Sequence, residues 1–419
     1  MNQNGKNGAR SEREARYLSR VEIENIRSIG RLVWEAAPAP GWNVVLGDNG
    51  SGKTTFARAI AYALVPPNER AALRAGAAFW FRDRGESEGR IVVEWKAEDL
   101  PIAASTIHFK PTDAGHAMWE GPLTESANPL FVAGFGPFRR FSGGDPDREK
   151  QFSGFPAAAR VVSLFEESHS FTESLAWLKL LRFKEAAGDA ASAPESSRLL
   201  SSIRAFVNQD GFLPNEARLD RITPDHVVFI DGNGADVPIE DLSDGYRSIL
   251  SLTFELIRQL AWHQGVEQVF DASSTRIVAP GIVLIDEVDA HLHPTWQRRI
   301  GPLLRGAFPL VQFIVTTHSP LVCQAADTIY HLPRPGTDEE GHPVAGGELD
   351  RLRYGDLADA YGTLAMGVVG RSESAHAMLE RLSSLNRKEL DAGLTDEETA
   401  EQRRLRRVFG AGPLPEKQA

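Results

Sequence analysis

The segment that decides the fold is "GDNGSGKT", Gly47 to Thr54. It fits the pattern G-x-x-x-x-G-K-[ST] and lies between a strand-like apolar run, "GWNVVLGD", and a helical run, "TTFARAIAYAL". In such a loop the glycines let backbone N–H groups turn inward around phosphates, and the positive end of the next helix faces them. The segment therefore predicts a phosphate-binding loop. A glycine-rich turn that matches by chance would leave the flanking strand and helix unexplained.

Side chains at the end of this loop have predicted roles of their own. Lys53 is expected to reach the β- and γ-phosphates and to act in catalysis, and Thr54 is expected to ligate Mg²⁺. The predicted ligands of the loop are therefore a nucleoside triphosphate and Mg²⁺. The predicted nucleotide-binding positions of the loop are Gly47, Asp48, Asn49, Gly50, Ser51, Gly52, Lys53, Thr54 and Thr55.

A second signal is "GIVLIDEVDAHLHP", Gly281 to Pro294. Its apolar run predicts a buried strand that ends at two carboxylates, and parallel sheets place functional residues at such ends. We assign Asp286 to Mg²⁺ and Glu287 to the attacking water, which it would orient and deprotonate. A strand followed by two acids is weak evidence alone, but it becomes strong beside a phosphate loop.

Histidines near the strand ends allow more than one interpretation. The run "FIVTTHSP", Phe313 to Pro320, predicts another buried strand, after which a neutral His318 imidazole could contact the γ-phosphate or the attacking water. A structural histidine is the alternative, and the two preceding motifs favour the catalytic role. His291 and His293 could share one face of an extended segment, but no third metal ligand has a convincing spacing, so structural or interface roles are preferred.

Composition limits the class of protein. The chain has 419 residues, 42% hydrophobic and 25% charged, with a formal net charge of −11, which argues against a surface devoted to nucleic acid. The single cysteine, Cys323, excludes an internal disulfide, and the absence of a long apolar run or a secretion signal leads us to expect a cytoplasmic protein. Basic pairs and runs could form local patches or merely solvated faces. They are Arg139 with Arg140, Arg298 with Arg299, and Arg403 to Arg407.

The order of predicted elements indicates an α/β protein. Alternating and apolar runs predict strands in the first half, a helical pattern follows from about Arg160, and strand and helix alternate again in the second half, including a hairpin around Asp231 to Gly234. The expected organisation is a flexible tail over 1–16, the first part of a nucleotide-binding head over 17–159, a helical insert over 160–225, the second part of the head over 226–335, and a C-terminal loop and helical region over 336–419.

The stretch "EDLSDGYRS", Glu240 to Ser248, precedes an apolar helical run. Ser243 could simply cap that helix. Ser243, Gly245 and Arg247 could also offer a hydroxyl, backbone N–H groups, the positive helix end and a charge to a phosphate. Both roles stay open from the residues alone.

Taken in order, the phosphate loop, "LSDGYRS", "LIDE" and "TTHS" resemble the motifs of ABC-type ATPases, more narrowly the SMC, RecF and OLD-like branch. The resemblance implies that Leu242, Ser243 and Gly245 belong to the signature motif, which caps ATP held by a second head in a head-to-tail dimer. Asp244 stands where Gly is more usual, and Tyr246 and Arg247 also depart from the common pattern. It also implies an ATPase head with a P-loop core sheet, flanking antiparallel strands, a helical insert and here a C-terminal helical tail.

The compact head, "IDEVDAHLHP" and "FGPFRR", Phe135 to Arg140, resemble the PtuA-like ATPases of Septu and retron anti-phage systems. That resemblance implies an oligomeric ATP-binding scaffold with a separate HNH nuclease partner, and possible contact with DNA through the complex but not with a membrane. The resemblance also implies that the Gly134–Arg140 segment lies near the nucleotide in the position of the Q-loop, although it contains no Gln. The alternative class is a RecF-like or SMC-like DNA clamp. A transporter subunit and a non-hydrolysing ATP sensor are less favoured.

Overall fold

The computed structural model describes most of the chain. The described residues are 15–73, 77–80, 88–97, 101–112, 115–120, 130–141, 152, 154–188, 193–337, 339–355, 360, 373–391 and 393–409. Most of the tail expected over 1–16 therefore lies outside the described residues.

A six-stranded sheet forms the centre of the head, in the order β14-β13-β3-β12-β11-β7. Its first five strands in sequence are parallel, and β14 pairs antiparallel at one edge. The apolar runs around Val44, Val283 and Val315 are buried throughout, as strands covered on both faces must be. The strands are β3 (Gly41–Leu46), β7 (Val132–Phe135), β11 (Gly281–Ile285), β12 (Val311–Thr317), β13 (Thr328–His331) and β14 (His342–Pro343).

The register of this core sheet aligns the carboxyl ends of its strands. Leu46 pairs with Thr317, and Ile285 lies between Val315 and Phe135. The segments that follow β3, β7, β11 and β12 therefore emerge at one edge of the sheet, where α/β proteins bind their ligands.

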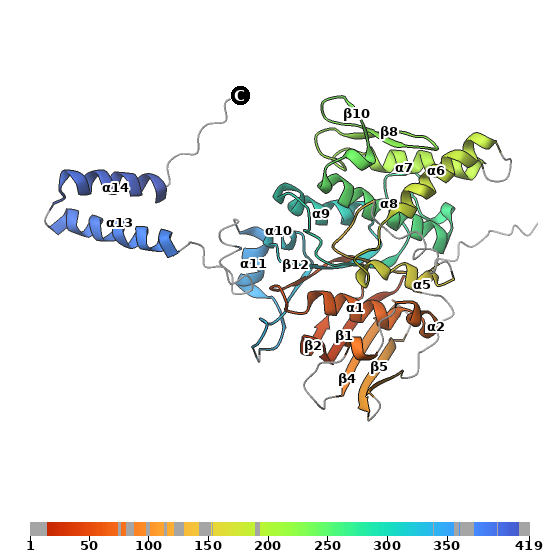
Figure 1. The fold of residues 1–419 in the computed structure, drawn as a ribbon, viewed down its shortest axis with the longest axis horizontal. Helices are drawn as coiled ribbons and strands as arrows, with labels where there is room; N and C mark the ends of the chain where they lie inside the picture. The colour runs from red at the N-terminus through yellow and green to blue at the C-terminus, as the bar shows by residue number, and fades with distance from the viewer. Residues whose placement is uncertain are drawn as a thin grey trace, which may run out of the picture.

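An antiparallel sheet covers one side of the head, in the order β2-β1-β4-β5-β6. Its strands are β1 (Tyr17–Ile26), β2 (Ile29–Glu35), β4 (Gly89–Lys96), β5 (Ala103–Thr112) and β6 (Gly115–Glu120). Helix α1 (Lys53–Leu64) lies between this sheet and the core sheet (Figure 1). Its Phe56 and Ile60 are fully buried in a cluster that includes Ile91 of β4 and Leu284 of β11. Burial on both sides fixes the start of α1, and so the phosphate loop, against the core.

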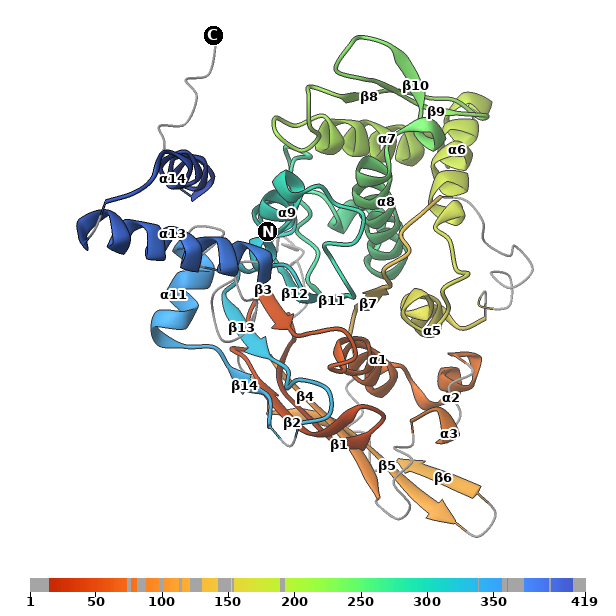
Figure 2. The same cartoon turned by 60° about the vertical axis from the view of Figure 1, so that its left-hand side comes forward.

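Helices cover the opposite face of the core sheet (Figures 1 and 2). The longest, α8 (Asp244–Gln264), buries Leu250, Phe254 and Leu256. The other helices of this side are α6 (Thr172–Ala187), α7 (Ala193–Val207) and α9 (Pro294–Ala307), whereas α5 (Pro156–Ala159) buries Ala158 in the same cluster as α1. Shorter helices elsewhere are α2 (Pro67–Arg70), α3 (Ala77–Trp80), α10 (Pro320–Cys323) and α11 (Gly346–Tyr354).

A three-stranded sheet of β8 (Arg218–Ile222), β9 (Val227–Ile230) and β10 (Asp236–Pro238) lies beside these helices (Figure 2). The hairpin expected around Asp231 to Gly234 is formed by β9 and β10. The stretch 160–225, expected to be helical, also contains β8, because Leu219 pairs with Phe229 across the turn. The strand β8 depends on its pairing with β9, a contact that the local sequence pattern does not show.

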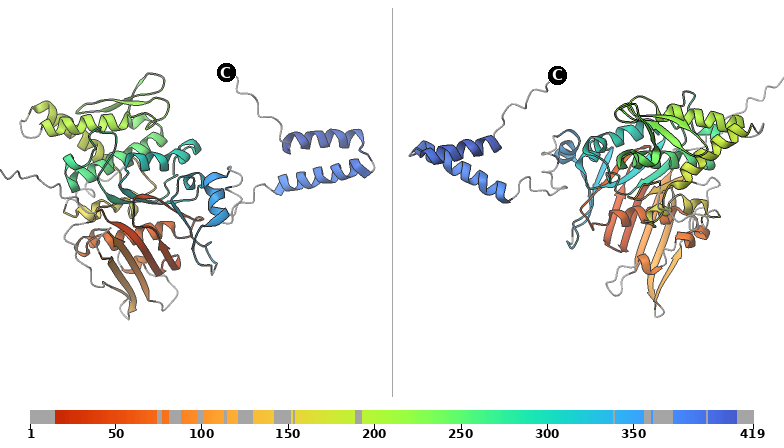
Figure 3. Two further views of the ribbon diagram at one scale, coloured as in Figure 1. Left: turned by 180° about the vertical axis from the view of Figure 1, so that it is seen from behind. Right: turned by 45° about the horizontal axis from the view of Figure 1, so that its top comes forward.

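The C-terminal hairpin consists of α13 (Glu373–Asp391) and α14 (Asp396–Phe409), and it stands apart from the head in Figures 1 and 3. Its small core is Leu382, Leu385 and Leu405. The basic run of α14 is partly neutralised within the hairpin, where Arg406 lies 3.0 Å from Glu389.

None of the described helices is long and apolar enough to cross a membrane. The predicted fold class, an α/β head with a parallel core sheet, flanking antiparallel strands, a helical insert and a C-terminal helical tail, is confirmed.

Candidate nucleotide-binding site

The phosphate loop connects β3 to α1 and is built around Lys53. Its Nζ donates hydrogen bonds to the carbonyl oxygens of Gly47, at 2.8 Å, and Asp48, at 2.9 Å. Burial lowers the pKa of Lys53, while the charges of Glu287 and Asp286 oppose that shift. The ammonium group is thus held inside the loop, and the two carboxylates that follow β11 are close enough to act on it.

The backbone of the loop suits an anion. Gly52, which precedes α1, has a φ of 107°, a left-handed conformation that favours glycine, and no side chain caps the helix start. The first N–H groups of such a helix have no intrahelical acceptors and can face a phosphate. Ser51 adds a buried hydroxyl oxygen without a hydrogen-bond partner in the described residues. Asp48, Asn49 and Gly50 lie exposed at the rim, and Thr55 is buried.

Asp286 joins the phosphate loop to β12. Its two carboxylate oxygens accept hydrogen bonds from Thr54 Oγ1, at 2.7 Å, and from Thr316 Oγ1, at 2.5 Å. The side chain is almost completely buried. Hydroxyl and carboxylate oxygens are the ligands that Mg²⁺ prefers, so Thr54 and Asp286 together fit the predicted metal role. Mg²⁺ bound there would neutralise phosphate charge.

Glu287 begins the turn that follows β11. Its φ is 47°, in the left-handed region that non-glycine residues seldom occupy. The backbone N–H of Glu287 donates to Thr316 Oγ1, at 2.8 Å, which helps to hold this conformation. The side chain is only partly buried, so its carboxylate is accessible at the same sheet edge as the phosphate loop.

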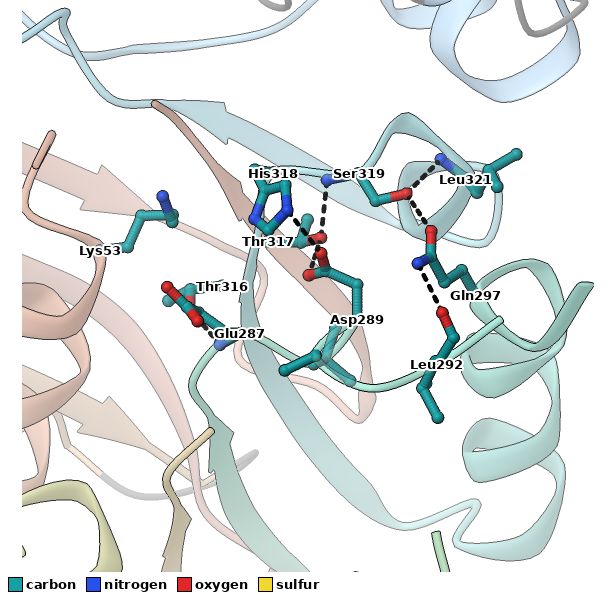
Figure 4. Close-up of polar contacts among 12 residues, drawn as sticks. Lys53, Glu287, Asp289, Leu292, Gln297, Thr316, Thr317, His318, Ser319 and Leu321 are labelled. Carbon is teal, nitrogen blue, oxygen red and sulfur yellow. Dashed lines mark hydrogen bonds and ion pairs between the residues drawn. The ribbon is translucent and has the colours of Figure 1, made fainter. Parts of the chain in front are cut away.

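His318 follows β12 and belongs to a network that extends away from the loop (Figure 4). Its Nε2 lies 3.3 Å from Oδ2 of Asp289, whose other oxygen accepts a hydrogen bond from Thr317 Oγ1. Asp289 is buried, whereas His318 is exposed. The sequence interpretation overlooked Asp289. Its signal was a third acid two positions after Glu287, in the turn that must pass the end of β12.

Ser319 continues this network beyond His318. Its Oγ donates to Oε1 of Gln297, at 2.7 Å, and Gln297 in turn donates to the Leu292 carbonyl (Figure 4). Ser319 Oγ also accepts the N–H of Leu321 and so caps α10. The turn after Glu287, the start of α9 and the segment after β12 are therefore held together by polar contacts.

The signature segment lies at the start of α8. Gly245 faces the turn after Glu287, since a Cβ placed there would lie 3.7 Å from the His291 carbonyl oxygen. Ser243 is exposed and makes no side-chain hydrogen bond to cap α8. Arg247 donates to the carbonyl of Glu240, at 2.8 Å, and to the Asp244 carboxylate. Within the described residues, no hydrogen bond or ion pair joins Ser243 or Arg247 to the phosphate loop of the same chain.

The expectation that Arg139 belongs to a basic patch or a solvated face is wrong. It is buried, with 5% of its surface exposed, and its guanidinium contacts the turn after β11 and Ser248 of α8. Arg140, the next residue, is exposed. The sequence could not show which of the two arginines is buried, because both follow the short strand β7 and no alternation of polar and apolar residues marks this segment.

Arg298, Arg299 and the nearby histidines lie on or before α9. Both arginines are exposed, and Arg299 donates to the Gly211 carbonyl. His293 caps α9, because its Nδ1 accepts the N–H of Thr295. No group of three potential metal ligands occurs in the part of the chain that the structure describes. His293 therefore has the structural role that the sequence favoured.

Two family models and several curated proteins are similar to this chain. Residues 156–324 match a family model described as "AAA domain, putative AbiEii toxin, Type IV TA system", and residues 20–90 match one described as "AAA domain". The Septu protein PtuA of Bacillus mycoides is 29% identical over 73% of this chain and 38% of its own length. The Septu protein PtuA of Bacillus thuringiensis is 31% identical over 40% of this chain and 41% of its own length. The Retron Ec83 probable ATPase of Escherichia coli is 38% identical over 28% of this chain and 20% of its own length.

The parallel core, the phosphate loop and the paired carboxylates resemble the nucleotide-binding core of ABC-type ATPases, and both matching family models describe AAA domains. Within that class the chain resembles the Septu protein PtuA and the retron ATPases. It spans less than half the length of each of these relatives.

Proposed function

We propose that this chain binds Mg·ATP and hydrolyses it. The observation that carries this proposal is the hydrogen bond between Thr54 and Asp286, which brings the end of the phosphate loop to the carboxylate after β11. Lys53 and Glu287 lie at the same edge of the sheet. A phosphate held by the loop would therefore have a cation beside it and a candidate base within the same site.

The proposed roles follow from exposure and charge. Lys53 would bind the β- and γ-phosphates, and Thr54 and Asp286 would hold Mg²⁺. Glu287, which is accessible, would orient and deprotonate the attacking water. His318, with Asp289 at 3.3 Å behind it, would contact the γ-phosphate or that water.

Two variants test this proposal. Lys53→Ala should abolish ATP binding, because it removes the cation of the loop. Glu287→Gln should retain ATP binding but lower kcat on the order of a hundredfold or more, as expected when a general base is lost. Binding is measured by calorimetry and turnover by phosphate release. Glu267→Gln, at an exposed position outside the site, is the matched control. Wild-type turnover in Glu287→Gln would show that the role of Glu287 is wrong.

We further propose that two heads pair around ATP. Ser243 and Gly245 at the exposed start of α8 would contact the nucleotide of a second copy, head to tail. The support is that Ser243 is neither buried nor used to cap its own helix. Its hydroxyl and the helix N-terminus are consequently available to a phosphate from outside. Arg247 could join them only after leaving its present partners, the Asp244 carboxylate and the Glu240 carbonyl.

The cellular role that we propose is the ATPase subunit of a bacterial anti-phage complex that regulates a separate nuclease, of the HNH type. The support is the resemblance to PtuA and to the retron ATPases. The test is to co-express the chain with the product of its adjacent reading frame and to measure co-purification and DNA cleavage. Nuclease activity that responds to Glu287→Gln is the expected result, and a neighbouring repair gene without a nuclease would contradict it.

A second candidate is a RecF-like DNA clamp. Its support is an identity of 33% over 86 residues, 20% of this chain, to the DNA replication and repair protein RecF of Acidothermus cellulolyticus. The net charge of −11 weighs against it. ATP-dependent and salt-sensitive binding of duplex DNA by the isolated chain would favour this candidate over the first.

A further inference from the structure

Arg139 occupies a buried position between three parts of the head. Its Nη1 donates to the carbonyl oxygens of Gly136, at 2.9 Å, and Asp286, at 3.1 Å. Its Nη2 donates to the carbonyls of Glu287, Val288 and Ala290, at 3.1, 3.2 and 3.4 Å. Its Nε donates to Ser248 Oγ, at 3.1 Å. One side chain thus contacts the segment after β7, the turn after β11 and helix α8.

These contacts engage all three nitrogen atoms of the guanidinium, which has only five N–H donors. Arg139 therefore has no donor group directed to a phosphate, and any effect on the reaction must pass through the backbone that it holds. Burial lowers the pKa of Arg139 to about 10, against the opposing charges of Asp289, Asp286 and Glu287. The side chain remains charged at neutral pH.

The turn that Arg139 holds contains the candidate catalytic base. Glu287 has a φ of 47°, a conformation that costs energy and persists only when neighbouring groups maintain it. Thr316 holds its N–H, and Arg139 holds its carbonyl oxygen. The direction of the Glu287 side chain accordingly depends on where Arg139 lies.

Ser248 connects the same guanidinium to the signature segment. It lies on α8, whose first residues include Gly245 and follow Ser243 directly. A shift of α8 would move the Ser248 hydroxyl, and Arg139 would pass that movement to the turn. Arg139 and Ser248 are both buried. If a shift of α8 broke the hydrogen bond between them, water could not replace it.

We propose that Arg139 is a positioning residue that couples α8 to Glu287, so that contact of the signature segment with a second copy of the head orients the catalytic carboxylate. This inference rests on the proposed function. It assigns regulation of that site to a side chain that makes no contact with the phosphate loop in the described residues.

Ser248→Ala is the most specific test, because it removes the α8 end of the connection and leaves Arg139 on the turn. We expect kcat to fall about tenfold while KM for ATP changes less than about twofold, since positioning in the transition state is lost and ground-state binding is not. Arg139→Lys keeps the positive charge but not the several N–H donors of the guanidinium. Its kcat should therefore fall further than that of Ser248→Ala. Arg140→Lys is the exposed control and should behave as wild type.

A double-mutant cycle separates coupling from a structural effect. Ser243→Ala and Ser248→Ala should each slow turnover. The double variant should be no slower than the slower single variant, because both substitutions interrupt the same coupling between the signature segment and Glu287. A merely structural role for Ser248 would lower the unfolding temperature and give additive losses.

Wild-type kcat in Ser248→Ala, or additive losses in the cycle, would overturn the inference. The proposed function fails separately, if the wild-type chain does not hydrolyse ATP or if Glu287→Gln hydrolyses it at the wild-type rate.

Discussion

At the residue scale, the site depends on a few buried polar side chains whose partners come from other strands. Asp286 accepts hydrogen bonds from α1 and β12, and Asp289 accepts one from Thr317 and lies against His318. Buried carboxylates are costly unless they are fully paired. Their pairing here fixes the direction of the accessible groups, the partly buried Glu287 and the exposed His318, that would act on the nucleotide.

Asp289→Asn should weaken the support of His318 without removing the phosphate loop. A hydrogen bond to a charged group is worth about 1.5–3 kcal/mol, so we expect kcat to fall about tenfold to a hundredfold. ATP affinity should stay near the wild-type value. Phosphate-release kinetics and calorimetry measure the two quantities. Asp231→Asn, in the exposed turn between β9 and β10, is the control. An unchanged kcat in Asp289→Asn would show that the contact between Asp289 and His318 has no catalytic importance.

At the scale of elements, α8 combines an apolar face with a buried ionic cluster. Arg258 donates to Glu255, at 2.6 Å, and also lies 3.0 Å from Glu173 of α6. Burial raises the pKa of Glu255, but Arg258 outweighs that effect, so the pKa lies below its ordinary value. Since the folded pKa is depressed, this carboxylate stabilises the fold above its unfolded pKa, and the stabilisation is lost as pH falls through the folded pKa.

Glu255→Ala should therefore destabilise the helical side of the head. Without Glu255, the buried Arg258 loses the closer of the two acidic partners named above and keeps the partly exposed Glu173, so we expect a cost of about 3 kcal/mol in the free energy of unfolding. Chemical denaturation at neutral pH and at about pH 4 measures the effect, and the difference between wild type and variant should shrink at the lower pH. Glu267→Ala breaks the exposed pair with Arg198 and should change stability by less than about 1 kcal/mol. Equal costs for both variants would contradict this expectation.

The pattern of apolar residues along the chain predicted the longer strands and helix α1 of the core, but it missed two short strands. The strands β3, β11 and β12 and the helix α1 follow from apolar runs and from the phosphate-loop motif. The four-residue strands β7 and β13 were not predicted, because neither is long enough to show a period. They are strands only because β11 and β3 offer them an edge.

At the scale of the whole molecule, the head presents the start of α8 to solvent while the phosphate loop lies at the edge of the core sheet. This arrangement supports the proposed pairing of two heads. The C-terminal hairpin has its own small core, separate from the two cores of the head.

Ser243→Arg should block pairing but leave the head folded and able to bind ATP, because Ser243 is exposed and caps nothing. In a Glu287→Gln background, ATP should convert the protein to a dimer, and adding Ser243→Arg should keep it monomeric. Analytical ultracentrifugation with and without ATP measures this. Ser273→Arg, at an exposed position in the loop that precedes β11, is the control. Loss of ATP binding in folded Ser243→Arg would mean that the segment serves its own chain.

The sequence by itself determined the class of protein, because a phosphate loop and a strand that ends in two acids are local patterns whose chemistry depends on adjacent residues. It did not determine the burial of Arg139, the pairing of Asp289 with His318, or the availability of Ser243. Only the tertiary structure decided these features. The physical reason is that each depends on contacts between segments far apart in the chain, such as Arg139 with Ser248, which the order of strands in the sheet brings together and no local period encodes.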